Sequence, residues 1–186
     1  MTQLKVISDD LYRYTGSRSF FDNMLCFLRV PGAKYTVCLR LTALLKKKLW
    51  AKPLYLVLAM ILKHYQYKFG IDIPYNTDIG HGLYIGHYGN IVVSAKAIIG
   101  KNCNINHGVT IGETYGGKNP GVPIIQDNVY LGPGSKIIGG ITIGRNVAVG
   151  ANCVVVDSVP DNAVVVGVPG KVVSYNGANN YVVNTT

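Results

Sequence analysis

The segment IVVSAKAIIGKNCNINHGVTIG, residues 91–112, carries a branched apolar residue at every sixth position. Apolar positions recur every three or four residues in an amphipathic helix and every two residues in a half-buried strand, so neither requires this spacing. The same period runs along the chain after Gly70. Its apolar positions are Ile73, Ile79, Ile85, Val93, Ile99, Ile105, Ile111, Ile125, Leu131, Ile137, Ile143, Val149 and Val155.

Small or apolar residues stand four positions after the later members of this series. They are Val129, Ser135, Ile141, Val147, Cys153 and Val159. A unit of six residues is too short to bury its own apolar side chain, so the units must form flat faces that stack on the next coil, as internal repeats do. The period therefore predicts a parallel β-solenoid.

Charge divides the chain at about the same place as the period. Residues 1–70 contain 12 Lys and Arg against 3 Asp and Glu, whereas residues 71–186 contain 6 of each. A change of composition of this kind marks a candidate domain boundary. We therefore expect a basic domain over residues 1–70, followed by a repeat domain rich in Gly, Val and Ile.

The basic half has a helical pattern between about residues 17 and 69. One apolar stripe at spacings of three and four consists of Cys38, Leu41, Leu45 and Leu49. Pro53 is suited to the first turn of a further helix. The apolar run over residues 54–62 is much shorter than the roughly 18 residues that a membrane span needs. Its basic flanks are either a solvated face or a peripheral contact with an anionic membrane or polymer.

Cysteine usage and the first residues bear on where the protein works. The four cysteines are widely spaced with no C-x-x-C pair, which favours buried free thiols over a zinc knot or a disulfide scaffold. The start, MTQLKVISDD, has acidic residues where a signal peptide needs an apolar core. We therefore expect a cytoplasmic protein. No convincing ligand set for a metal is present among the histidines.

The repeat is interrupted twice, and function on a repeat scaffold tends to sit at such interruptions. The spacing from Ile85 to Val93 is eight rather than six, which predicts a bulge that contains His87. The spacing from Ile111 to Ile125 is fourteen and includes GETYGGKNPGVP, which predicts an extruded loop.

His87 is the first candidate for a catalytic base, because an imidazole in an outward bulge does not fill the core and accepts a proton near neutral pH. Asp72 is expected to stack beside Val92, one strand spacing of about 4.8 Å away, where its carboxylate would orient the ring. His107 is the rival base, and it is also a candidate to line the acceptor site. The other two histidines, at positions 64 and 81, are expected to be structural.

Two kinds of motif resemble known families. The IGxxxx units and GVPGKVV at 167–173 are similar to the hexapeptide-repeat acyltransferases, whose coil is a left-handed β-helix of three hexads. DIPYNTDIGHGLYIGHYGNIVV at 72–93 and VPGAKYTVCLRLTALLKK at 30–48 resemble serine acetyltransferases, in which an Asp and a His at this separation form the catalytic dyad. Asp72 and His87 match that pair.

The resemblance implies an α+β fold, with a short α-helical domain followed by a left-handed parallel β-helix over residues 71–173. At 18 residues per coil, this β-helix would have about four to five coils and one extruded loop. A polar tail over residues 174–186 would follow. The family is trimeric, with its active site between subunits, so the resemblance implies a homotrimer or a dimer of trimers.

The resemblance also implies acetyl-CoA as co-substrate and no metal. The positions that match the donor site are Gly132, Gly134, Gly150, Ala151 and Lys171. The glycines have a second explanation, because a tight turn of the hexad needs glycine at this place. Attack by a hydroxyl on a thioester then proceeds with concurrent proton removal by the base.

The acceptor is where the sequence departs from serine acetyltransferases. These enzymes hold the charged ends of L-serine with an Arg-His pair after the loop and an Asp in the helical domain. Here the chain reads NPGVPII and RYTGSRS at the corresponding places. A zwitterion would lose its hydration with no charged side chain to replace it. We therefore expect the acceptor to be a sugar hydroxyl in polysaccharide biosynthesis, in a site lined by His107 and Tyr88.

Two alternatives remain. One keeps the chemistry with L-serine as acceptor. The other is a non-catalytic β-solenoid that binds an anionic polymer through its basic half. Nucleic acid is not expected, because the chain has no recognisable binding module and its tyrosines form no stacking pattern.

Overall fold

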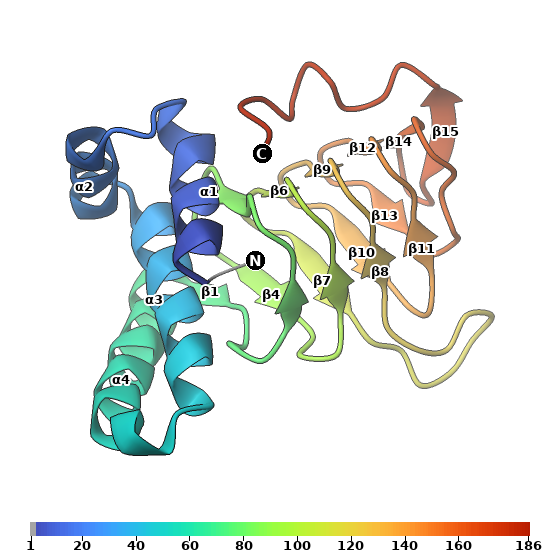
Figure 1. Cartoon of the computed structure of the whole chain (residues 1–186). Helices are drawn as coiled ribbons and strands as arrows, with labels where there is room; N and C mark the ends of the chain where they lie inside the picture. Colours follow the sequence, from blue (N-terminus) through green and yellow to red (C-terminus); the bar gives the residue numbers. More distant parts are fainter. Residues whose placement is uncertain (1–2) are drawn as a thin grey trace.

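The computed structural model describes residues 3–186, which form a helical half and a β-helix (Figure 1). The helical half contains α1 (Gln3–Thr15), α2 (Phe20–Arg29), α3 (Pro31–Lys46), the short 3₁₀-helix η1 (Leu49–Ala51) and α4 (Lys52–Phe69). The helices α2 to α4 confirm the helical pattern expected from residue 17 to residue 69. Helix α1 lies before that region and was missed.

Proline and glycine set the limits of two of these helices. Pro31 and Pro53 lie in the first turns of α3 and α4, where the missing N–H of proline has no intrahelical partner to lose. Gly70 ends α4 with φ of 61°, a left-handed conformation that glycine adopts without steric cost. The first strand begins at the next residue.

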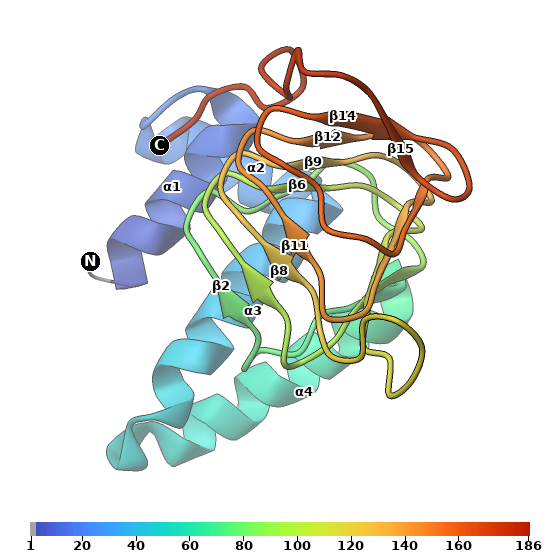
Figure 2. The same cartoon turned by 90° about the vertical axis from the view of Figure 1, so that its right-hand side faces the viewer.

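After Gly70 the chain forms a left-handed β-helix with three parallel faces. Sheet A contains β1 (Ile71–Asp72), β4 (Ile91–Val93), β7 (Thr110–Gly112), β10 (Lys136–Ile138) and β13 (Val154–Val155). Sheet B contains β2 (Asp78–Ile79), β5 (Ile98–Ile99), β8 (Ile124–Ile125) and β11 (Thr142–Ile143). Sheet C contains β3 (Tyr84–Ile85), β6 (Asn104–Ile105), β9 (Tyr130–Leu131), β12 (Ala148–Val149), β14 (Val164–Val166) and the antiparallel β15 (Lys171–Ser174). Figure 2 is a view down the axis of the β-helix, and it shows sheets B and C as separate faces.

The hexad residues fill the interior of the β-helix, as the period predicts. Every apolar residue of the first series is exposed by 8% or less, and every residue of the second series is also buried. Every third member pairs across neighbouring coils, for example Ile105 with Leu131. The structure therefore confirms the four to five coils that the period predicts. It also confirms which side of each strand faces inward. The predicted helical stripe is confirmed only in part, because Leu49 at its end lies in η1 and is exposed.

Buried charges join the helical half to the first coil. Arg40 of α3 donates to the carboxylate of Asp10 in α1 at 2.8 Å and to the backbone oxygen of Ile79 at 2.7 Å. Asp10 also accepts from the backbone N–H of Leu83 at 2.8 Å. Burial raises the pKa of Asp10, and the Arg40 guanidinium opposes that shift. One hydrophobic core includes residues of both halves, so the division into two domains at residue 70 stays a prediction.

The segment after β15 runs back along sheet C toward α1 (Figures 1 and 2). Ala178 and Val182 are buried against Ala148 of β12, and the Tyr181 ring stacks on Tyr130 with centroids 4.6 Å apart. The polar tail is therefore held against sheet C at Ala178 and Val182, whereas most of its other residues are exposed.

All four cysteines are buried free thiols, as their spacing predicts. Burial raises the pKa of Cys103 to about 12. In the part of the chain that the structure describes, the helices are too short or too polar to cross a membrane.

Candidate functional site

One edge of the β-helix carries most of the predicted site residues. The turns that follow β3, β6, β9, β12 and β14 stack on one another along this edge, which we call the corner ridge. Backbone hydrogen bonds join its successive levels, from Gly108 N to Gly89 O at 2.7 Å and from Gly134 N to His107 O at 2.9 Å. The predicted residues on or directly beside the ridge are His87, Tyr88, His107, Gly132, Gly134, Gly150, Ala151 and Lys171.

His87 and His107 occupy the first two levels of the ridge. Both residues are exposed, and their rings lie 6.0 Å apart between centroids at an angle of 78°. They meet because Ile85 pairs with Ile105, which places two residues 20 positions apart on neighbouring coils. His107 is exposed at the same level of a coil without surplus residues, so exposure at this turn does not depend on the bulge.

Asp72 lies in register with Val92, as the coil length predicts. Its carboxylate accepts a hydrogen bond from Gln66 Nε2 of α4 at 3.2 Å. Within residues 3–186, no hydrogen bond or ion pair joins Asp72 to His87. The orienting role of Asp72 therefore stays a prediction, and the structure adds Gln66 as a direct neighbour of this carboxylate.

Aromatic residues fix the backbone around this carboxylate and the bulge. The Tyr35 hydroxyl of α3 donates to Ile73 O at 2.8 Å and accepts from Ile73 N at 3.1 Å, directly after Asp72. Burial raises the pKa of Tyr35 to about 12, so its hydroxyl keeps its proton at neutral pH. The Tyr88 ring packs on Phe69 at the end of α4, with centroids 5.6 Å apart. The helical half thus supports both sides of the candidate site.

The glycines of the ridge are needed for the close approach of successive coils. A Cβ added at Gly132 would lie 2.6 Å from Val149 O, and one at Gly150 would lie 2.8 Å from a methyl carbon of Val166. Gly134 has φ of 73° and faces the Asn152 side chain. These positions therefore have a structural requirement for glycine, whether or not a ligand passes them. Ala151 and Lys171 differ, because both are exposed.

A shallow cleft of about 360 Å³ lies between α1, α2 and the start of α3. Tyr14 lines it and accepts a hydrogen bond from Ile85 N at 2.9 Å, two residues before His87. Asp22 and Arg29 of α2 line the same cleft and bring one negative and one positive charge. The cleft does not follow from the sequence, because its acidic residue, Asp22, lies beyond the RYTGSRS segment at 13–19.

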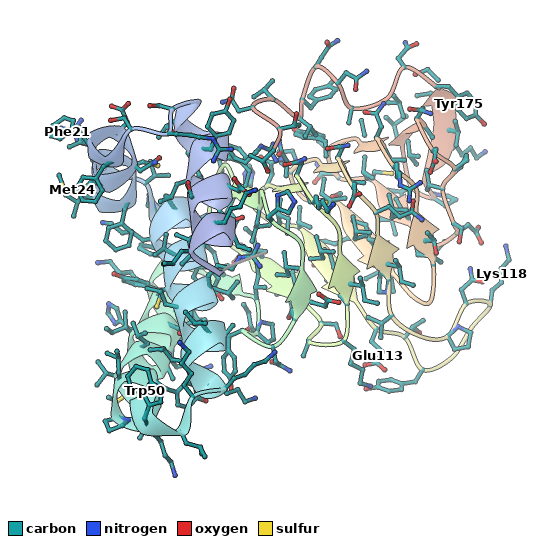
Figure 3. The ribbon with its side chains drawn as sticks, viewed as in Figure 1. Phe21, Met24, Trp50, Glu113, Lys118 and Tyr175 are labelled. Atoms are coloured by element: carbon teal, nitrogen blue, oxygen red, sulfur yellow. The ribbon has the colours of Figure 1, made fainter. Side chains whose placement is uncertain are left out.

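The extruded loop leaves the β-helix at a different edge from the corner ridge. It follows β7 and returns at β8, with an antiparallel bridge between Thr114 and Gly121. Lys118 pairs with Asp157 at 2.7 Å and holds the loop against a later coil. Figure 3 shows Glu113 and Lys118 on this loop, at the side of the β-helix away from α2 and α3.

Comparisons with known proteins identify relatives that share the repeat and the fold of this chain. Residues 123–157 match the family model described as bacterial transferase hexapeptide (six repeats). A serine acetyltransferase of Synechococcus elongatus is 35% identical over 168 residues, which cover 89% of this chain and 65% of that protein. The crystal structure of Neisseria gonorrhoeae serine acetyltransferase in complex with serine has a TM-score of 0.74 and 30% identity, and the match covers 92% of this chain and 69% of that one. The chain belongs to the serine acetyltransferase-like hexapeptide transferases.

Another solved relative of this hexapeptide transferase is a serine acetyltransferase in complex with CoA, with a TM-score of 0.74, 27% identity, and coverage of 92% of this chain and 69% of that one. The chain spans less than two thirds of the length of the curated relatives that it matches, namely 62% and 65% in two of them. Family membership confirms the resemblance drawn from residues 72–93 and 30–48.

Proposed function

We propose that this hexapeptide transferase moves an acetyl group from acetyl-CoA to an acceptor hydroxyl, with His87 as general base. The observation that carries the proposal is the exposed imidazole of His87 on the bulge, beside His107 and next to the predicted donor edge. The relatives named serine acetyltransferase and the relative solved with CoA support the same chemistry.

The reaction needs one proton transfer and one bond exchange. His87 takes the hydroxyl proton while the hydroxyl oxygen attacks the thioester carbonyl carbon, because a free hydroxyl has too high a pKa to ionise first. The carbon–sulfur bond of the resulting tetrahedral species then breaks. The CoA sulfur leaves with the bonding electron pair and takes the proton from the imidazolium. The products are an acetyl ester and CoA, with no covalent acyl-enzyme and no metal.

Asp72 would stabilise the imidazolium that forms at His87. Its position opposite Val92 places it one coil away from the end of the bulge. Its hydrogen bond from Gln66 fixes one carboxylate oxygen, and the other oxygen has no hydrogen-bond partner within residues 3–186. This second oxygen is the one we assign to the histidine.

The donor would lie along the corner ridge from His87 toward Lys171. The ridge supplies backbone groups at Gly132, Gly134 and Gly150, and the Lys171 ammonium at its end suits the phosphates of CoA. The extruded loop stands at another edge of the same chain, so a loop of a neighbouring subunit would complete the site. This arrangement supports a homotrimer.

L-serine is the acceptor that we propose. The relatives with the highest similarity reported above are named serine acetyltransferases, and one of them is solved with serine. The cleft with Asp22 and Arg29 offers one charge of each sign beside the strand that leads to His87. This evidence reverses the order of acceptors expected from the sequence. A sugar hydroxyl stays the second candidate, because NPGVPII after the loop contains no Arg or His.

An acceptor panel tests the proposal through the release of free CoA thiol. We expect turnover with L-serine that exceeds turnover with nucleotide-linked and lipid-linked sugars. Turnover with a sugar and none with L-serine would restore the polysaccharide alternative. No thiol release above the buffer rate with any acceptor would contradict an acetyltransferase and favour the non-catalytic β-solenoid.

A further inference from the structure

Helix α4 is apolar on its outward side as well as on its packed side. Leu62 and Phe69 point into the shared core, as amphipathicity requires. On the outward side, Leu54, Val57 and Ile61 follow one another at spacings of three and four, so they form a single stripe, and Trp50 of η1 directly precedes α4. We call α4 face the exposed residues Leu49, Trp50, Leu54, Val57, Met60 and Ile61.

The exposure of this face is large for apolar side chains. Leu49 is 93% exposed, Trp50 79% and Met60 65%. Exposed apolar residues that gather in one patch mark an interaction surface. Single exposed apolar residues scattered over a molecule do not. Figure 3 shows Trp50 at the end of the helical half, remote from Tyr175 on the last coils.

Only positively charged residues flank the α4 face in the sequence. Residues 23–71 contain no Asp or Glu. The lysines at positions 47, 48, 52, 63 and 68 are exposed, and none of them takes part in an ion pair within residues 3–186. The Lys48 ammonium lies 5.7 Å from the Trp50 ring centroid, so one cation stands directly over the apolar surface.

This combination selects among three possible occupants. A second copy of the same face would bring two rims of lysines together without a carboxylate to offset them. A soluble polyanion would neutralise the lysines but leave the apolar stripe in water. The surface of an anionic bilayer satisfies both, since apolar side chains and Trp enter the headgroup boundary while lysines meet the lipid phosphates.

We propose that the α4 face binds the surface of membranes rich in anionic lipid, with α4 lying in the plane of the interface. The later coils of the β-helix lie away from α4, so they stay in water (Figure 1). The inference does not depend on the proposed acetyl transfer, because none of its residues belongs to the corner ridge.

The single tryptophan of the chain makes the test direct. The full chain is mixed with vesicles of equal parts phosphatidylglycerol and phosphatidylcholine, or with vesicles of phosphatidylcholine alone. We expect a blue shift of Trp50 emission and co-sedimentation with the anionic vesicles only, and we expect both to weaken as salt is raised.

Two variants divide the contributions of charge and apolar contact. K47Q/K48Q/K52Q is expected to lower partition by about fivefold per lysine, or about a hundredfold in total. L54S/V57S is expected to remove the blue shift while it leaves all lysines in place. The matched control K101Q/K118Q/R145Q removes three positive charges from the β-helix and is expected to bind like the parent. Thermal unfolding of each variant checks that the fold is kept.

Several results would overturn the proposal. Trp50 emission that is already blue and shielded from acrylamide without vesicles would show that another copy covers the α4 face. Equal binding by neutral vesicles would remove the role of the lysines. An equal blue shift with soluble polyphosphate would assign the face to a polymer instead of a bilayer.

Discussion

The β-helix and the helical half differ in where their apolar residues and charges lie, although residues such as Val92, Ile98 and Ile124 of the β-helix are also exposed. Every hexad of the β-helix turns its apolar residue inward, and its positive and negative side chains are equal in number. The helical half leaves Trp50 and its neighbours in solvent and carries the whole excess of positive charge. The difference indicates that the β-helix surface is built to hold a site, whereas the helical surface is built to meet a partner.

The two halves also depend on each other. The first coil has no preceding coil to cover it, and α1 and α3 take that place through Asp10, Arg40 and Tyr35. Tyr35 bonds the backbone of Ile73, and Gln66 donates a hydrogen bond to the side chain of Asp72. The helical half is therefore part of the candidate site as well as its cover.

The largest effect on stability is expected from breaking the buried junction between the halves. D10A leaves the Arg40 guanidinium buried without its carboxylate and should lower the free energy of unfolding by about 3–5 kcal/mol. Chemical denaturation measures this change in the free energy of unfolding. The control K118A removes one partner of the exposed pair with Asp157 and should leave the free energy of unfolding almost unchanged. A cost below 1 kcal/mol for D10A would mean that the halves fold independently of this pair.

A matched pair of leucine variants sharpens the contrast between inward and outward apolar residues. L131A empties a fully buried position and should cost about 2–5 kcal/mol. L49A makes the same change on the α4 face and should stay within about 0.5 kcal/mol. Both are measured by denaturant unfolding of the full chain. Equal costs would show that Leu49 is covered in the native assembly.

The smallest of these effects is expected at the contact between the halves beside the site. Q66A removes the hydrogen bond that orients the exposed carboxylate of Asp72 and should lower kcat for acetyl transfer by about two- to fivefold, because an exposed charged pair contributes up to about 1 kcal/mol. The KM for acetyl-CoA and the unfolding midpoint should not change. The control Q126A lies on the β-helix away from the ridge. A rise in KM with unchanged kcat would contradict a positioning role for Gln66.

The sequence predicts the β-helix far better than the site. The period of six determines which face of each strand is inward, and the spacing of eight between Ile85 and Val93 locates the bulge with His87. The pairing of Asp72 with Val92 follows from counting residues per coil. Such counts work because each coil contacts only its neighbours.

Contacts that come from the helical half do not follow from any count. Gln66 and Asp72 are close in the sequence, but their bond depends on how α4 meets the first coil. Helix α1 does not follow from the sequence, because its buried acids look like surface residues until Arg18 is placed beside Asp9 and Arg40 beside Asp10. The cleft with Asp22 and Arg29 likewise exists only once α1, α2 and α3 are packed.

The most direct test of the central claim compares three histidine variants in the release of CoA from acetyl-CoA with L-serine present. H87A should lower kcat about 100- to 10,000-fold, because it removes the general base. H107A should keep most of the activity, and H64A, an exposed histidine on α4, should match the parent. Activity of H87A within twofold of the parent, or a greater loss in H107A, would contradict the assignment of His87.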